Sequence, residues 1–292
     1  MSVAGSQSNL ADASALDATV CGGPVLVRPA GGHVGGRTTS PRPAWLRVQG
    51  KEGVLFIAGV ILLWQLASAV IPFSGHYLFP SPVLTAQTLW VSLPELLLGT
   101  GYSFLILAPS LALAIALGIL WGMLVGTAPA LNRMFSPFAR FVSPVPPTIY
   151  IPYAIALLPT FRSAAGFVVF VGVFWPVFLN TCSGAATLPR HYRDNARILG
   201  LRRGEYLRRV VFPATLPQIF AGISIGLVFA FIMLTVAEQF GASNGIGRFV
   251  QLYADYADYP RMVAGILYTG VVVWISMEVL ERIKKRALFW LK

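Results

Sequence analysis

The sequence predicts an all-α integral membrane protein, and three observations carry this prediction. Apolar residues make up 56% of the 292 residues and charged residues only 11%, whereas soluble chains have roughly 45–50% and 25%. The mean hydropathy is +0.70. The apolar residues also gather into blocks close to the length of a membrane-spanning helix, which needs about 20 residues. There is too little polar surface here to cover a globule in water.

Six blocks after residue 50 are long and apolar enough to be spanning helices. They cover residues 54–71, 102–126, 141–158, 164–181, 219–237 and 262–277. The third block contains four prolines, which kink a helix and free backbone carbonyls that must then face protein or water. We interpret them as a packed kink or as part of a pathway lining. The stretch 73–100 is also broken by prolines and predicts a loop with a short surface helix.

Residues 1–50 differ from the rest of the chain. They are rich in Gly, Ser, Ala and Pro and show no helical or strand periodicity. Such a segment cannot bury enough apolar surface to fold alone, which predicts a disordered tail. No continuous apolar core precedes Arg28, the first basic residue, so a cleaved signal peptide is not expected. The six-span domain then covers residues 51–292.

The basic residues orient the spans. With the tail inside, 19 of the 22 Lys and Arg residues fall on the cytoplasmic side, as the positive-inside rule requires. Only Arg162, Arg248 and Arg261 fall outside. Both termini are therefore expected in the cytoplasm, and Arg133 and Arg140 are expected in a cytoplasmic loop. The net charge of +11 fits this membrane topology, and we expect no nucleic-acid partner.

The sequence lacks the chemistry of an ATPase or an ion-coupled transporter. Lysine occurs only at positions 51, 284, 285 and 292, so no G-x-x-x-x-G-K-[ST] phosphate loop lies among the spans, and the residues around Lys51 do not form one. No predicted span holds an acid pair, a His–carboxylate pair or a buried Arg. Glu238 and Glu278 lie near span ends, where we expect interfacial solvation. We expect no catalytic residue, no metal ligand and no cofactor on this chain.

Small residues recur every fourth position in two spans. The second span contains Ser110, Ala114, Gly118, Gly122 and Gly126, and the fifth contains Gly222, Gly226 and Ala230. Such ridges let helix backbones approach closely where lipid supplies no hydrophobic drive. Helix packing within one chain is the simplest interpretation, and a dimer seam or a sliding surface also fits.

The segment 188–217 between the fourth and fifth spans is long and basic. Pro189 suits a helix start, and Gly200 is placed as the residue after the helix, in the left-handed conformation. A second short helix is expected over 203–210, before Pro213. Three residues share one face of the first helix: Tyr192, Ala196 and Leu199. The segment either enforces topology and contacts lipid headgroups or forms a docking element, and its helix caps favour docking.

This segment resembles the E-A-A-x-x-x-G-x₉-I-x-L-P coupling loop of permease subunits of binding-protein-dependent ABC importers. The matching residues are Asp194, Asn195, Ala196 and Gly200, then, after nine residues, Val210, Phe212 and Pro213. Further matches are Pro80-Ser-Pro82, Pro144-x-Pro146-Pro147, Phe178-Leu-Asn180-Thr181, and Val236-Ala-Glu238 followed by Gly241-Ala-Ser243. Together they resemble the nitrate/sulfonate/taurine branch over about residues 54–290.

The resemblance implies a type-I ABC importer permease fold with six transmembrane helices, acting as a homodimer in a bacterial inner membrane. A separate ATPase subunit, which would bind ATP and Mg, would dock on the loop. The contacting residues would be Asp194, Asn195, Ala196, Arg197, Gly200, Leu201 and Pro213. We place the translocation pathway at Pro144, Pro146, Asn180 and Glu238.

The resemblance also implies a periplasmic or lipid-anchored solute-binding protein, which would deliver a small anion such as a sulfonate, taurine or nitrate. In such importers selectivity resides largely in the binding protein, so this sequence does not set the substrate. An ion-coupled secondary transporter subunit and a non-transporting membrane scaffold are the alternatives. The first would need intramembrane charges or an inverted repeat.

Overall fold

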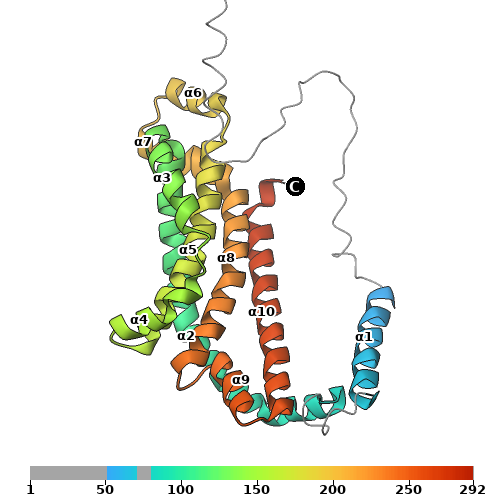
Figure 1. Ribbon diagram of the computed structural model, residues 1–292. Helices are drawn as coiled ribbons and strands as arrows, with labels where there is room; N and C mark the ends of the chain where they lie inside the picture. The colour runs from blue at the N-terminus through green and yellow to red at the C-terminus, as the bar shows by residue number, and fades with distance from the viewer. Residues whose placement is uncertain (1–50, 71–79, 292) are drawn as a thin grey trace, which may run out of the picture. The chain divides into compact units, whose positions relative to one another are not determined.

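The computed structural model describes residues 51–70 and 80–291, and every regular element in these ranges is helical (Figure 1). The predicted tail, residues 1–50, lies outside the described residues. The described residues form two compact units. The first comprises 105–237 and 275–291, and the second comprises 51–70, 80–104 and 238–274. α2, α8 and α10 each contribute to both.

The elements follow in this order: α1 (Lys51–Val70), α2 (Pro82–Thr127), α3 (Pro129–Val142), η3 (Pro147–Tyr150), α4 (Ile151–Leu157), α5 (Phe161–Ala186), α6 (Arg190–Ile198), α7 (Arg203–Tyr206), the π turn η4 (Leu207–Val211), α8 (Phe212–Gly241), α9 (Ile246–Asp255), α10 (Tyr259–Ala287) and η5 (Phe289–Leu291). Four helical stretches are long and apolar enough to cross a membrane: Pro82–Thr127, Phe161–Ala186, Arg203–Gly241 and Tyr259–Ala287. They contain the second, fourth, fifth and sixth predicted spans, and α1 coincides with the first.

The third predicted span, residues 141–158, is not a single helix. α3 ends at the start of that block, a turn follows, and η3 and α4 complete it. Pro129 suits the first turn of a helix, whereas the prolines at 144, 146 and 147 interrupt the next turn. The loop predicted around Arg133 and Arg140 is therefore wrong, because both lie within α3. The cytoplasmic side predicted for them stays a prediction.

α2 begins earlier than predicted, and the loop expected over 82–100 is helical. Ser81 Oγ accepts the backbone N–H of Leu84 at 3.3 Å, and Pro82 is the first helical residue, which together make an N-terminal cap. The Thr88 and Thr100 hydroxyls each donate to the carbonyl four residues earlier, at 2.7 Å. α2 has 46 residues, about 69 Å at 1.5 Å per residue, so only part of it can lie within a ~30 Å hydrocarbon layer.

The short helix predicted over 203–210 does not end before Pro213. α7, the π turn and α8 form one helical stretch from Arg203 to Gly241. In a regular α-helix the Pro213 ring would clash with the carbonyl of Arg209. The π turn, with its wider i→i+5 ring, ends at Val211, two residues before Pro213, and lets the helix continue.

Glycine ridges pack α2 and α8 against α5 in the first unit. A Cβ on Gly122 would lie 2.6 Å from Thr181 Cβ, and one on Gly126 would lie 2.5 Å from the carbonyl oxygen of Cys182. On α8, a Cβ on Gly222 would lie 2.9 Å from the carbonyl oxygen of Pro176. These distances leave no room for a side chain. Of the interpretations offered for the ridges, packing within one chain is confirmed at these positions.

Candidate functional site: the loop between α5 and α8

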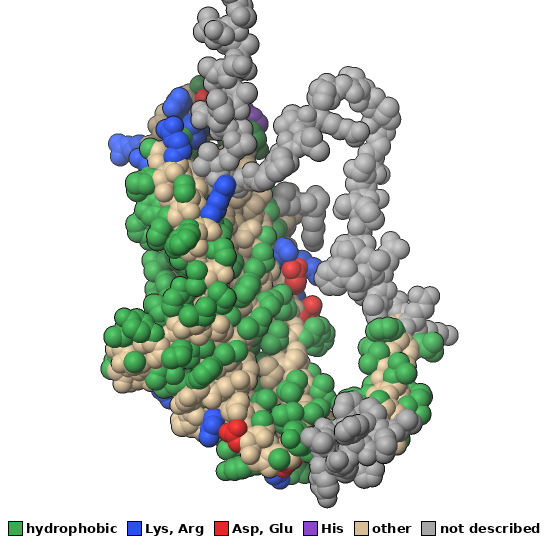
Figure 2. All heavy atoms as spheres, in the orientation of Figure 1, with side chains coloured by type: hydrophobic (Ala, Val, Ile, Leu, Met, Phe, Trp, Pro, Cys, Tyr) green, Lys and Arg blue, Asp and Glu red, His purple; other side chains and the backbone are tan. Residues whose placement is uncertain are grey.

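The loop that connects α5 to α8 projects from one end of the first unit. Figure 1 shows α6 and α7 at this end, next to the start of α3. The space-filling view shows Lys and Arg side chains gathered over the same elements (Figure 2). Apolar side chains cover the flank of the unit below them. A basic, polar cap on an apolar helix bundle is typical of a loop outside the membrane.

α6 ends in a Schellman motif at Gly200. The backbone N–H of Leu201 donates to the Ala196 carbonyl at 3.0 Å, and that of Gly200 donates to the Arg197 carbonyl at 3.0 Å. Gly200 has φ +64, the left-handed conformation that glycine adopts without steric cost. The predicted conformation of Gly200 is confirmed. The turn after α6 is therefore fixed by two backbone hydrogen bonds.

α7 begins with its own cap three residues further on. The Glu205 carboxylate accepts the backbone N–H of Arg202 at 3.1 Å, and it also lies 3.8 Å from the Arg209 guanidinium. A glutamate at the third helical position satisfies one of the N–H groups that a helix start leaves free. Two capped helices joined by a four-residue connection, residues 199–202, make a defined knob.

The inner side of α6 faces a groove of about 510 Å³. Its walls come from the α2–α3 junction and from α6 and α7, and include Thr127, Ala128, Pro129, Arg193, Ala196 and Tyr206. Of the three residues predicted to share a face, only Ala196 is buried, at 5% exposure. Leu199 is 73% exposed and the neighbouring Ile198 83%. The tip of the knob thus presents aliphatic side chains outward.

The structure leaves most of the predicted coupling residues accessible. Asp194, Asn195, Arg197 and Gly200 are exposed, and Leu201 and Pro213 are half-buried. Pro213 lies in the first turn of α8 rather than after a helix end. Their role in docking an ATPase stays a prediction.

The four predicted pathway residues are divided between the two units. Pro144 and Pro146 are exposed in the turn after α3. Asn180 Nδ2 donates to the Pro176 carbonyl of its own helix at 2.8 Å. Glu238 belongs to the second unit. Their role in a pathway also stays a prediction.

Glu238 is not solvated at an interface, as we had expected, but is 1% exposed. Its Oε1 accepts the Ser103 hydroxyl at 2.6 Å, and its Oε2 accepts the Gly247 N–H at 2.7 Å. The Ser103 oxygen in turn accepts the Ile246 N–H at 3.1 Å. The carboxylate and the hydroxyl thus bind the first N–H groups of α9, which have no partner within that helix.

The backbone at Gly245 approaches this carboxylate closely. A Cβ on Gly245, where φ is +141, would lie 2.5 Å from Glu238 Cδ, and a Cβ on Gly99 would lie 3.3 Å from the Gly245 carbonyl carbon. This site was missed by sequence reasoning because Ser103 lies 135 residues from Glu238. A glutamate in an apolar helix followed by G-x-G was the available signal.

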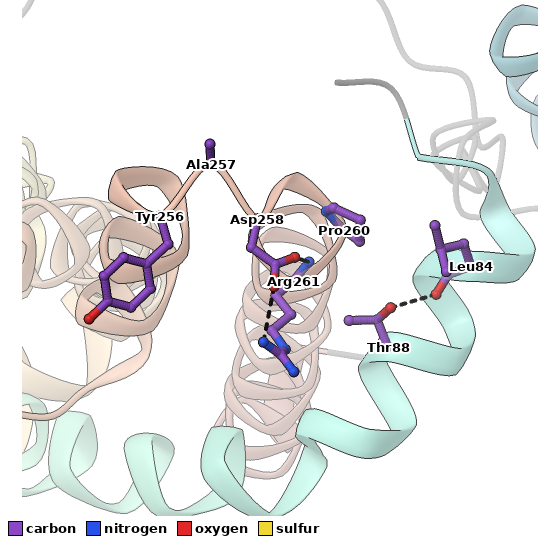
Figure 3. Close-up of a pocket in the computed structure, with 7 residues that line it drawn as sticks. All are labelled: Leu84, Thr88, Tyr256, Ala257, Asp258, Pro260 and Arg261. Atoms are coloured by element: carbon purple, nitrogen blue, oxygen red, sulfur yellow. Dashed lines mark hydrogen bonds and ion pairs between the residues drawn. The ribbon is translucent and has the colours of Figure 1, made fainter. Parts of the chain in front are cut away.

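An open pocket of about 610 Å³ lies at the turn between α9 and α10 in the second unit (Figure 3). Arg261 contributes its guanidinium, 3.0 Å from Asp258 Oδ2 and 5.1 Å from the Tyr253 ring centroid. Burial, and then a 3.1 Å hydrogen bond to Glu95, raise the pKa of Tyr253. Across the described ranges, no group of three or more His, Cys, Asp or Glu side chains could hold a metal.

α9 ends at this pocket in the same motif as α6, with alanine at the left-handed position. The Asp258 N–H donates to the Tyr253 carbonyl at 2.9 Å and the Ala257 N–H to the Ala254 carbonyl at 3.0 Å. Ala257 has φ 55, which is uncommon for a residue with a Cβ. The turn is therefore strained where the α6 turn is not.

Comparison with known proteins gives a family match. Residues 114–288 match the family described as binding-protein-dependent transport system inner membrane component. The nitrate import permease protein NrtB of Synechocystis sp. is 30% identical over 54% of this chain, and the match spans 58% of that relative's length. The bicarbonate transport system permease protein CmpB of Synechococcus elongatus is 28% identical over 81% of this chain and 91% of the relative. SsuC of Bacillus subtilis, a permease protein named for aliphatic sulfonates transport, is 27% identical over 85% of this chain and 91% of the relative.

Proposed function

The chain belongs to the family of binding-protein-dependent transport system inner membrane components, and from this membership we propose that it is the permease subunit of an ATP-driven importer for a small anion. The family and the four long apolar helices make it a multi-pass inner membrane protein. The uptake activity, the class of substrate and the partner proteins are what we propose.

The capped knob formed by α6, Gly200 and α7 is the observation that carries the proposal. A loop that only kept arginines on one side of a membrane would need no fixed turn. Here two hydrogen bonds and a left-handed glycine fix the direction in which α6 leaves the bundle. The exposed aliphatic side chains of Ile198 and Leu199 are suited to packing in a groove of a partner protein.

The proposed partner at this knob is a separate ATPase subunit that binds ATP and Mg. Asp194, Asn195, Arg197 and Gly200 would meet it directly, because they are exposed. Ala196 and Leu201 would act from beneath, since both line the groove behind α6. Pro213 would act through the helix that continues from the knob into α8.

A solute-binding protein and a second copy of this chain complete the proposed importer. The substrate is proposed as a small oxyanion, because the relatives are named for nitrate, bicarbonate and aliphatic sulfonates, all of which carry negative charge. The chain itself would hydrolyse no ATP, since its lysines lie only at 51, 284, 285 and 292 and form no phosphate loop.

Reconstitution of the purified chain in proteoliposomes tests the proposal. The chain alone should neither hydrolyse ATP nor take up labelled nitrate, bicarbonate or an alkanesulfonate under a proton or sodium gradient. Addition of an ATPase subunit and a solute-binding protein that co-purify with the chain should give ATP-dependent uptake of at least one of these anions. Uptake by the chain alone, driven by an ion gradient, would instead establish the secondary-transporter alternative.

The orientation proposed for the importer has the knob and both termini in the cytoplasm. A cysteine in place of Asn244 should react with an impermeant thiol reagent in intact cells, whereas one in place of Arg203 should react only after the membrane is opened. Labelling of the Arg203→Cys variant from outside would reverse the topology.

A further inference from the structure

Two cavities adjoin along the short helical segment that starts with α7. The first is the groove behind α6, to which this segment contributes Arg203, Tyr206 and Leu207. The second is a hollow of about 340 Å³, to which it contributes Gly204, Leu207 and Arg208. Residues three and four apart lie on the same face of a helix. Two neighbouring faces of the segment, with Leu207 at their boundary, therefore look into different cavities.

The hollow is apolar on every side except at Arg208. Its other walls come from the end of α2, through Leu120, Met123 and Leu124, and from Phe212 at the start of α8. Leu120 lies seven residues before the last residue of α2, about 10.5 Å at 1.5 Å per residue. The hollow therefore runs down the side of a helix that is apolar enough to cross a membrane, where hydrocarbon is the surrounding medium.

The groove, in contrast, is basic. Three arginines line it: Arg193, Arg197 and Arg203. Among the described residues that line either cavity, none is acidic. α3 begins at the groove wall, and its N-cap, Ala128, forms no side-chain cap, so the positive end of that helix adds to the charge of the arginines. The groove therefore favours a negatively charged group.

The acidic side chains of the knob do not pair with these arginines. The Glu205 carboxylate lies 3.8 Å from the Arg209 guanidinium and accepts the backbone N–H of Arg202. Asp194 is exposed and lines neither cavity. In the part of the chain that the structure describes, no ion pair involves an arginine that lines either cavity.

We propose that the two cavities together bind an anionic phospholipid, with its headgroup at Arg203 and Arg208 and one acyl chain in the hollow. A guanidinium binds phosphate oxygens through two parallel N–H donors, and basic residues next to a spanning helix attract anionic lipids. A soluble anion would need only the arginines. An ATPase subunit stays in water and would not reach the side of a spanning helix, whereas a phospholipid carries both an anionic headgroup and an acyl chain.

The bound lipid would fill the space between the knob and the bundle. The groove has α6 and α7 on one side and the α2–α3 junction on the other. A headgroup held there would brace the knob against the end of α2. This inference goes beyond the proposed importer function and needs no transport activity.

Lipid binding to the purified full chain tests the proposal. The measurement is saturable retention of radiolabelled phosphatidylglycerol by the chain in detergent. Phosphatidylethanolamine is the lipid without net charge, and glycerophosphoglycerol is the headgroup without acyl chains. The test variant is Arg203→Gln with Arg208→Gln. Its matched control is Arg202→Gln with Arg209→Gln, because these adjacent residues are also exposed, carry the same charge and line neither cavity.

The unmodified chain should bind phosphatidylglycerol in preference to phosphatidylethanolamine. The test variant should weaken this binding about 25-fold, about fivefold for each guanidinium, and the control variant should change it little. Gly204→Phe should also weaken it without a change of charge, because the added side chain starts in open space in the hollow, with nothing within 4 Å of its Cβ. Glycerophosphoglycerol should not displace the lipid.

Equal affinities of the two double variants would overturn the site and leave the arginines to a protein partner. Displacement by glycerophosphoglycerol, together with full binding by Gly204→Phe, would show a site for a free phosphate ester and overturn the lipid assignment. Equal binding of the two lipids by the unmodified chain would overturn the charge recognition without any variant. Unchanged elution profiles in detergent control for misfolding.

Discussion

Replacement of Gly200 by alanine should weaken the knob without disturbing its surroundings. Nothing lies within 4 Å of a Cβ built at Gly200, so the substitution meets no steric clash with other residues. The cost comes from the backbone alone, since φ is +64. An ordinary residue in this conformation costs about 1–2 kcal/mol, and a β-branched residue such as valine costs more.

The expected result is a loss of the turn rather than a loss of the fold. A free-energy change of 1–2 kcal/mol alters an equilibrium by about 5- to 30-fold. Amide hydrogen exchange at Gly200 and Leu201, whose N–H groups form the Schellman bonds, should accelerate by up to this factor. The apparent affinity for the proposed ATPase partner should fall, by at most this factor, because only the knob in its native turn is competent to bind.

Gly204→Ala is the matched control. It too has nothing within 4 Å of the added Cβ, but it lacks a positive φ and lies within α7, where alanine is the better helix former. It should leave exchange and partner binding unchanged or improved. If Gly200→Ala and Gly204→Ala behaved alike in both measurements, the left-handed turn would have no part in docking.

Three further changes test other parts of the structure. Gly126→Ala places a Cβ 2.5 Å from the Cys182 carbonyl oxygen and should lower stability by about 1–3 kcal/mol. Thermal unfolding in detergent measures this against Gly101→Ala, whose added Cβ meets nothing within 4 Å, and equal midpoints would contradict the packing. Ser103→Ala removes one donor to Glu238 and the acceptor for the Ile246 N–H. Amide hydrogen exchange at the start of α9 should therefore accelerate, by an amount set by the ~1–3 kcal/mol cost of an unsatisfied buried group. Unchanged exchange rates there would show that Ser103 and Glu238 do not hold the start of α9. The raised pKa of Tyr253 favours the neutral phenol in the folded protein. The contribution of Tyr253 to stability is therefore present below the ordinary tyrosine pKa of about 10 and is lost as pH rises through the raised pKa. Tyr253→Phe should abolish this loss of stability at alkaline pH, measured as thermal unfolding against pH.

The features that could be predicted from the sequence are those whose causes are local. The end of α6 follows from a glycine placed after the last helical residues, and its two hydrogen bonds span only four and six residues. The long apolar blocks likewise predict spanning helices from their own length and composition alone. The start of α2 also has a local cause, in Ser81 and Pro82, but Pro94 within the same stretch is typical of a loop.

The features that could not be predicted depend on residues distant in sequence. The burial of Glu238 requires Ser103 from α2 and the backbone of Gly245 and Gly247, and none of these marks a carboxylate partner alone. The packing of α3 beside α5 joins Phe138 and Trp175, whose ring centroids lie 6.5 Å apart although the residues are distant in sequence. The apolar block that begins at residue 141 predicts a loop at Arg140, whereas Arg140 lies within α3.

The glycine contacts between α2, α5 and α8 also have a mechanical consequence. Where side chains meet, a change of rotamer can absorb a shift of one helix against another. At Gly122, Gly126 and Gly222 the glycine backbone of α2 or α8 meets backbone or Cβ atoms of α5. No side chain on the glycine's helix can change rotamer there to absorb a shift. A force applied at the knob would be passed along these three helices with little loss, and any rearrangement of the first unit must occur at seams where the contacts are between longer side chains.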